Sequence, residues 1–246
     1  MELTGKAINF LGDSITEGAG ASAPDKCYVE VLRRNYGLTH ARNYGISGTR
    51  IAHQMQASDN PRNDLDFCGR FHKMDDHADA VVVFGGTNDF GHGLAPFGEI
   101  GDFSPDTFCG ACDTLYKGLR TKYPHIPVII VTPTPRRAET DPHGDGSKPT
   151  KQPLCAYVDA IQKIAAVNGL PVLDLFHCAP VGHRDLFPPE LFPDGLHPND
   201  IGHARLAAQI AEFLQTLERI KIVLPLPYLG KTALFFIRSN LRRWWQ

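Results

Sequence analysis

The chain has 246 residues, of which 42% are hydrophobic and 21% are charged, and its formal net charge is −2 at pH 7. This length and composition suit one well-filled domain of a soluble protein. Without an excess of basic residues the chain lacks the charge that binds a polyphosphate backbone, which excludes nucleic acid as an expected partner.

Short apolar runs alternate with longer amphipathic stretches, the pattern of βα units that build a parallel sheet covered by helices on both faces. The runs at 81–84 and 128–131 are apolar throughout, as expected of strands buried on both faces. In chain order the pattern predicts a strand at 7–11, a helix at about 26–36, strands at 41–44 and 80–84, a helix at about 105–123, a strand at 128–132, a helix at about 153–168, a strand at 171–175 and a helix at about 200–217.

The last predicted helix carries apolar residues at helical spacing, which indicates a face that packs on the core. These residues are Ile201, Leu206, Ile210, Phe213, Leu214 and Leu217. Two long connections, 90–104 and 133–152, interrupt the regular layout. Loops of such length inside a compact domain are usually functional or disordered.

The segment 218–246 follows the last of these helices, and we expect it to be a C-terminal appendage to a domain at 1–217. A further amphipathic helix is predicted at about 229–245, with basic residues beside an apolar side formed by Leu234, Ile237, Leu241 and Trp244. Basic amphipathic helices can lie on membranes. We expect this one instead to cover an apolar patch of its own domain or of a second subunit in a homodimer.

The N-terminal residues lack the basic and then apolar pattern of a secretory signal, so a cytoplasmic protein is predicted. Six cysteines in a chain of this length do not form a disulfide scaffold, and reduced thiols fit the same compartment. The close pair Cys109 and Cys112 is predicted to be two small helix residues, because no second pair follows that would complete a metal site. No metal is expected.

Glycine-containing polar segments follow the first three predicted strands, at the carboxyl ends where open parallel sheets bind ligands. A fourth such segment precedes the last predicted helix. The four are Gly12-Asp13-Ser14, Gly45-Ile46-Ser47-Gly48-Thr49, Gly85-Gly86-Thr87-Asn88-Asp89 and Asp194-Gly195-Leu196-His197-Pro198.

These segments contain every group that ester hydrolysis by a serine requires: a nucleophile, an imidazole base, a carboxylate that orients it and donors for the oxyanion. Ser14 is the candidate nucleophile, and Asp194 and His197 stand close enough in one loop to pair with each other. The candidate oxyanion donors are the backbone N–H groups of Ser14 and Gly48 and the side-chain amide of Asn88. Glycine suits position 48 because it lets the backbone approach a substrate closely.

Taken in order, the four segments resemble the motifs of the SGNH hydrolases, also called the GDSL esterase/lipase family. The resemblance covers residues 1–217. It implies an α/β fold, a flavodoxin-like three-layer α/β/α sandwich with a five-stranded parallel sheet, and the roles given above to Ser14, Gly48, Asn88, Asp194 and His197. The chain has no Gly-x-Ser-x-Gly, so the nucleophile elbow of the α/β-hydrolase fold is absent.

Several residues near the predicted site have other interpretations. Ser14 alone would also suit a helix cap or a contact to phosphate. Asp13 is predicted to make a hydrogen bond in its turn, and Asp89 to close one. Together with Asp13, His92 in the glycine-rich loop is a candidate for lining the substrate pocket, since loops concentrate binding residues.

Two patterns compete with the esterase interpretation. The segment 18–23 satisfies Gly-x-Gly-x-x-Ala of dinucleotide-binding folds, but it begins seven residues after the strand and Pro24 follows it, so a nucleotide site is not favoured. Potential metal ligands form the second pattern, but their spacing matches no metal site, so they are predicted to be surface residues. These residues are His53, His72, His77, Asp75 and Asp76.

The sequence therefore predicts a serine esterase that forms an acyl-enzyme without a cofactor. Small carboxylic esters, with acetylated carbohydrates first, are the expected substrates. The resemblance also implies lysophospholipase or thioesterase activity as an alternative. A non-catalytic sugar- or nucleotide-binding module, with the loops at Gly45 and Gly85 as anion sites, is an alternative of a different class.

Overall fold

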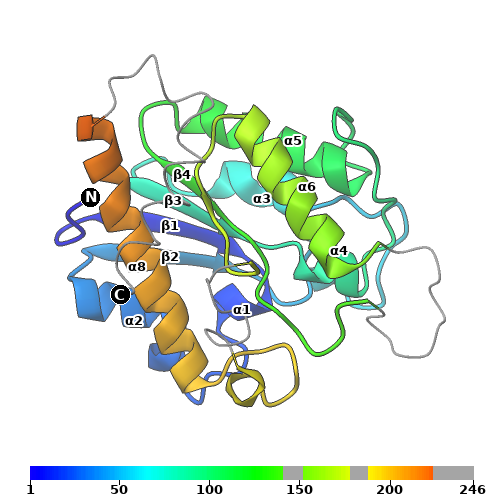
Figure 1. Ribbon diagram of the computed structural model, residues 1–246. Coiled ribbons are helices and arrows are strands. Elements are labelled where there is room, and N and C mark those ends of the chain that lie inside the picture. The colour runs from blue at the N-terminus through cyan, green and yellow to red at the C-terminus, as the bar shows by residue number, and fades with distance from the viewer. Residues whose placement is uncertain (141–151, 178–187, 224–246) are drawn as a thin grey trace.

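The computed structural model describes residues 1–140, 152–177 and 188–223 of the chain (Figure 1). All pairings in its five-stranded sheet are parallel, and the strand order is β2-β1-β3-β4-β5. The strands are β1 (Ala7–Gly12), β2 (His40–Gly45), β3 (Ala80–Phe84), β4 (Val128–Val131) and β5 (Val172–Leu173). This order is that of flavodoxin-like sheets, and the predicted fold class is confirmed.

Two layers of helices cover the sheet, one on each face (Figure 1). Val81 and Val83 of β3 pack into one core cluster, whereas Val82 and Phe84 pack into the other, because successive side chains of a strand point to opposite faces. One layer contains α2 (Tyr28–Tyr36) and α8 (Asp200–Val223). The other contains α3 (Phe67–Arg70), α5 (Phe108–Lys122) and α6 (Leu154–Val167).

Local hydrogen bonds explain where the observed elements differ from the predicted ones. Helix α5 begins at Phe108, later than predicted, because Thr107 caps it: Thr107 Oγ1 accepts a hydrogen bond from Gly110 N at 3.1 Å. Strand β5 is shorter than predicted, because Leu175 N donates to the side chain of Thr132 at 2.8 Å rather than to a neighbouring strand. Helix α8 extends to Val223, past its predicted end.

Two of the sequence predictions concerned helix faces. The predicted core face of α8 is present at Leu206, Ile210 and Leu214, which are buried, but the inclusion of Ile201 is wrong, because this residue in the first turn is 60% exposed. Cys109 and Cys112 are buried, free thiols within α5. The amphipathic helix predicted at 229–245 lies outside the described residues.

Short helical turns complete the structure, and the sequence pattern did not predict them. Helices α1 (Ser14–Glu17) and α4 (Thr87–Gly91) follow directly on the ends of β1 and β3. Four 3₁₀ turns lie within the described connections, at η1 (Pro24–Lys26), η2 (Pro61–Asp64), η3 (Phe71–Lys73) and η4 (Pro189–Leu191).

The register of the sheet aligns its strand ends. Gly12, the last residue of β1, is opposite Gly45 of β2 and Phe84 of β3, and Phe84 is opposite Val131 of β4. Four chain segments therefore leave the sheet at the same level and at the same edge. Three of them carry the motifs that were selected from the sequence.

Replacing Gly45 by alanine tests how tightly this edge is packed. A Cβ at Gly45 would lie 2.2 Å from Glu17 N and 2.6 Å from Thr16 C, both backbone atoms of α1. Because backbone cannot move aside as a side-chain tip can, we expect Gly45→Ala to lower the free energy of unfolding by about 1–3 kcal/mol. Urea unfolding followed by circular dichroism measures this loss.

Gly69→Ala is the matched control. Gly69 is helical, and a Cβ there would meet nothing closer than 3.4 Å, so the substitution is expected to be neutral or to stabilise the protein by up to about 1 kcal/mol. Equal stability of the Gly45→Ala variant and the wild type would show that β2 and α1 are not in contact as described.

Candidate active site

Ser14 is the first residue of α1, immediately after the turn that follows β1. Asp13 caps this helix, since its Oδ1 accepts a hydrogen bond from Ile15 N at 3.0 Å. N–H groups in the first turn of a helix have no acceptor within the helix, which leaves the Ser14 N–H available to an oxyanion. Ser14 itself is only 5% exposed.

The structure brings Ser14, His197 and Asp194 into one hydrogen-bonded series. Ser14 Oγ lies 2.9 Å from His197 Nε2, and His197 Nδ1 lies 2.6 Å from Asp194 Oδ2. With the proton on Nδ1 donated to Asp194, Nε2 is the acceptor for the serine hydroxyl. This is the arrangement in which an imidazole can act as the base for a serine nucleophile.

Asp194 holds its own loop as well as the imidazole. Its Oδ1 accepts hydrogen bonds from Leu196 N at 2.8 Å and from His197 N at 2.7 Å. Burial disfavours the ionised form, but the hydrogen bonds from the His197 backbone, the His197 ring and Leu196 N outweigh it and lower the pKa of Asp194. The carboxylate of Asp194 is therefore negatively charged, and this is the form that accepts the hydrogen bond from the His197 ring.

The loop after β2 presents Gly48 in a left-handed conformation, with φ at 76°. The positive φ favours glycine, and a Cβ at this position would also lie 2.2 Å from Asn63 Oδ1, so the side chain of Asn63 would have to move aside. Glu17 fixes the adjacent residue, because its Oε2 accepts hydrogen bonds from both the backbone N–H, at 2.7 Å, and the hydroxyl of Ser47.

Asn88 lies in α4 at the end of β3 and is buried. Its Nδ2 donates one hydrogen bond to Thr49 O at 3.0 Å, in the same loop as Gly48. An amide carries two N–H donors, so the second remains for a ligand. This hydrogen bond joins the loop that carries Gly48 to the helix that carries Asn88, and so connects the segments of two of the three predicted oxyanion donors.

Arg70 is a residue near this site that the sequence did not single out. It is 8% exposed, and its Nη2 donates to Gly12 O at 2.7 Å while its Nη1 donates to Tyr44 O at 2.5 Å. Nη2 also lies 3.2 Å from Thr49 Oγ1. Arg70 therefore fastens the ends of β1 and β2. No motif signals it, because its partners are distant in sequence.

Two buried carboxyl groups flank candidate site residues: Asp13 precedes Ser14, and Asp89 follows Asn88. Burial raises the pKa of Asp13 to about 7 and that of Asp89 to about 6. The prediction that Asp89 closes a local turn is wrong, because its carboxylate accepts hydrogen bonds from the distant Ile51 N and Ala52 N, each at 2.9 Å. Asp13 is 2% exposed and acts as the cap of α1, and its place in the substrate pocket stays a prediction.

His92 follows α4 and is partly buried. Its Nδ1 lies 3.4 Å from Arg50 Nη1, so its ring is directed toward the loop that follows Gly48. Gly20, from the glycine pattern that resembled a nucleotide motif, packs against the candidate active-site loop instead. A Cβ on Gly20 would lie 2.3 Å from Pro198 O.

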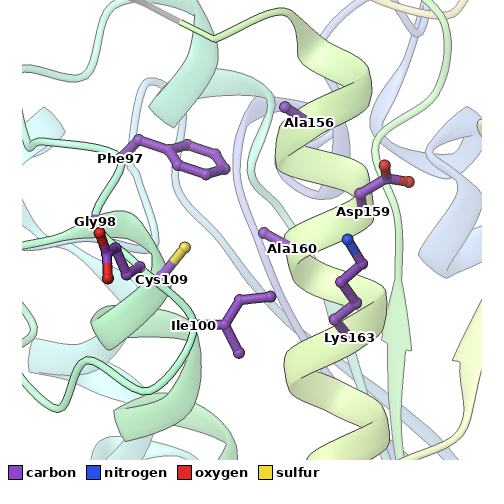
Figure 2. A pocket seen from close by; sticks show the side chains of 9 residues that line it. Phe97, Gly98, Ile100, Cys109, Ala156, Asp159, Ala160 and Lys163 are labelled. Atoms are coloured by element: carbon purple, nitrogen blue, oxygen red, sulfur yellow. The ribbon is translucent and has the colours of Figure 1, made fainter.

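A surface pocket of about 410 Å³ lies between the loop that contains Phe97 and helix α6 (Figure 2). The side chains of Ile100, Cys109 and Lys163 point into this region. None of the residues predicted for the catalytic site lines it. Within the described ranges, no group of three or more histidine, cysteine or acidic residues is placed to hold a metal ion.

Comparison of the chain with family models gives the class of the protein, a hydrolase. A family model described as "GDSL-like Lipase/Acylhydrolase family" matches residues 10–205. The chain belongs to this family, which confirms the resemblance seen in its motifs. Among the described helices, none is both long and apolar enough to cross a membrane.

Solved structures share the fold. A protein from Lactobacillus plantarum is 28% identical, with a TM-score of 0.70 over 87% of this chain and 98% of the other. A two-domain esterase active on acetylated mannans is 22% identical, with a TM-score of 0.53 over 88% of this chain and 50% of the other. A carbohydrate acetylesterase family member from Sinorhizobium meliloti is 16% identical, with a TM-score of 0.56 over 86% of this chain and 98% of the other. A comparison with curated proteins gave no match.

Asp13→Asn tests the buried carboxyl beneath the site. Because the pKa of Asp13 in the folded protein, about 7, exceeds its unfolded value of 3.8, the folded state binds the proton more tightly. The contribution of this carboxyl to the free energy of unfolding therefore falls as pH rises from about 4 to about 7. Asparagine keeps the cap without ionising, so we expect this fall to shrink by about 1 kcal/mol or more.

Denaturant unfolding of both proteins at several pH values in this window measures the difference. Some dependence on pH will remain in the variant, since Asp89 titrates in the same direction. Identical pH profiles for the two proteins would show that Asp13 ionises as freely in the folded state as in the unfolded chain.

Asn88→Ala tests the side-chain oxyanion donor. Loss of one such donor lowers turnover by about 10²- to 10³-fold, while loss of the hydrogen bond to Thr49 costs only about 1 kcal/mol of stability. Turnover of an aryl acetate measures the first effect and thermal unfolding the second. Asn168→Ala is the matched control, since Asn168 is also buried and donates to a backbone carbonyl, Ile164 O, at 3.0 Å.

We expect the control variant to lose stability and keep its turnover. A similar loss of turnover in both variants would mean that Asn88 acts through stability alone.

Proposed function

We propose that this protein is a serine esterase that hydrolyses small carboxylic esters through an acyl-enzyme. The single observation that carries the proposal is the series from Ser14 Oγ through His197 to Asp194, with distances of 2.9 Å and 2.6 Å. A serine hydroxyl is a weak nucleophile until a neighbouring base accepts its proton. The three groups are arranged for that transfer at the edge of the sheet where ligands bind.

In the first half of the reaction Ser14 Oγ attacks the ester carbonyl carbon while its proton passes to His197 Nε2. The carbonyl oxygen becomes an oxyanion held by the N–H groups of Ser14 and Gly48 and by the Asn88 amide. Collapse of this intermediate breaks the bond to the alcohol, which takes the proton from His197. Asp194 stabilises the imidazolium throughout.

In the second half, water attacks the acyl-enzyme and gives its proton to His197. The new oxyanion occupies the same donors, and its collapse returns the proton to Ser14 Oγ and frees the acid. The cycle needs no cofactor or metal, because the chain's own side chains supply the base, the acid and the charge stabilisation.

Short acyl esters, acetylated carbohydrates first, are the substrate class we favour. Two solved structures with the same fold support this choice by their descriptions, one as active on acetylated mannans and one as a carbohydrate acetylesterase family member. Lysophospholipids and thioesters are the second choice within the family.

A fluorophosphonate probe tests the proposal directly. The probe's phosphorus reacts with an activated serine oxygen and releases fluoride, so intact-protein mass should show one adduct, which peptide mapping should locate at Ser14. In His197→Ala the adduct should form at least about 10²-fold more slowly, because the base is missing. Arg33→Gln, on the surface of α2, is the control that should label as fast as wild type.

Absence of an adduct, while a known serine esterase reacts under the same conditions, would contradict the proposal. It would favour the sugar- or nucleotide-binding module instead, a function that Ser14→Ala should leave intact.

A further inference from the structure

A positively charged side chain stands beside the candidate site, on the segment that leaves β4. Arg136 extends over α4, where its Nη1 donates hydrogen bonds to Thr87 O at 3.2 Å and to Thr87 Oγ1 at 3.3 Å. Its guanidinium lies 5.3 Å from the centre of the Phe90 ring. Thr87 directly precedes Asn88, so Arg136 is fixed to the helix that carries an oxyanion donor.

The same segment contacts the loop that carries the candidate acid and base. Arg137 N donates to Gly195 O at 2.8 Å, between Asp194 and His197. A Cβ on Gly195 would lie 2.7 Å from Arg137 Cβ, so the two loops are in close contact. Arg136 therefore lies between α4 and the loop of Asp194.

The charge of Arg136 has no matching anion in the described structure. Its Nε is buried and has no hydrogen-bond acceptor, and among the described residues no carboxylate lies within ion-pair distance of its guanidinium. Arg50, by contrast, pairs with Asp64 at 2.9 Å. Burial lowers the pKa of Arg136, and only the more distant charges of Asp194 and Asp13 oppose the shift.

Partial removal of a guanidinium from water without a counterion is costly, and the cost is recovered when an anion binds. The hydrogen bonds to Thr87 use only Nη1, so the donors on Nη2 are left for a ligand. One guanidinium matches the single charge of a carboxylate, which arginine binds with charge-assisted hydrogen bonds.

We propose that Arg136 binds a carboxylate on the substrate, so that the protein prefers esters of acidic alcohols, such as acylated hydroxy acids or acidic sugars. This inference rests on the proposed esterase function and specifies its substrate class. Arg136 is thus a specificity-determining residue, whereas Ser14 and His197 perform the chemistry.

Matched pairs of esters test this preference. The substrates are the O-acetyl esters of glycolate, lactate and 3-hydroxypropanoate, each paired with the O-acetyl ester of the corresponding neutral amide. In the wild type, kcat/KM for the best acid should exceed that for its amide by about 10-fold or more. Arg136→Gln should abolish this preference, mainly by raising KM for the acids. It should leave kcat/KM for the amides within about 3-fold of wild type.

Two further variants separate specific binding from other effects. Arg136→Lys keeps the charge without the planar group and should retain part of the preference. Arg137→Gln removes the neighbouring charge, on a side chain that is exposed, and should retain all of it. Labelling of Ser14 by the fluorophosphonate probe in each variant shows that the site is still assembled.

Equal hydrolysis of acids and amides by the wild type would overturn the inference and leave the esterase function standing. So would an equal loss on acids and amides in Arg136→Gln, which would mean that Arg136 only fastens α4, or an equal loss of preference in Arg137→Gln. No hydrolysis of any ester, together with no labelling of Ser14, would overturn both proposals.

Discussion

The hydrogen bonds of the buried Arg70 guanidinium are the interactions on which the carboxyl-terminal end of the sheet depends. Its hydrogen bonds to Gly12 O and Tyr44 O satisfy carbonyl groups at the point where β1 and β2 stop pairing. Burial lowers the pKa of Arg70 to about 10, and the negative charges of Asp13, Asp66 and Glu17 oppose that shift. An apolar residue at this position would remove a charged donor from both carbonyl groups, and Gly12 O would keep its hydrogen bond from Ile46 N, at 3.1 Å. The segments that carry Ser14 and Gly48 start from these two strand ends.

Carboxylates hold the loops of the site in a repeated way. Asp89 accepts two successive backbone N–H groups, from Ile51 and Ala52, and Asp194 accepts those of Leu196 and His197. Glu17 holds Ser47 through both its N–H and its hydroxyl. These bonds hold the loops in place before any substrate arrives, so the donors that we propose for an oxyanion need little rearrangement during a reaction. Such preorganisation is the main source of electrostatic stabilisation in enzymes of this kind.

The local sequence pattern predicted the strands of the sheet and the positions of the motifs. It did not predict the contacts between residues that are far apart in the chain. Uninterrupted apolar runs sufficed for β3 and β4, since burial on both faces leaves a clear pattern. Helix α4 was missed because five residues show no helical period. The partners of Asp89 and Arg70 were missed because contacts between distant segments follow no spacing rule. Arg136 also follows a strand end, and that position is the signal by which it could have been found.

The two hydrogen bonds of the His197 ring join it to residues at very different separations along the chain. Its partner Asp194 is three residues away, whereas Ser14 is 183 residues away, and the terminal amino group of Met1 also reaches α8, at Leu214 O. The imidazole and its carboxylate can meet as soon as one loop forms. The serine reaches them only when β1 has joined the sheet and α8 has packed against it. Closing so long a loop costs more chain entropy than closing the short one, so a reactive serine reports that the distant segments of the chain have met.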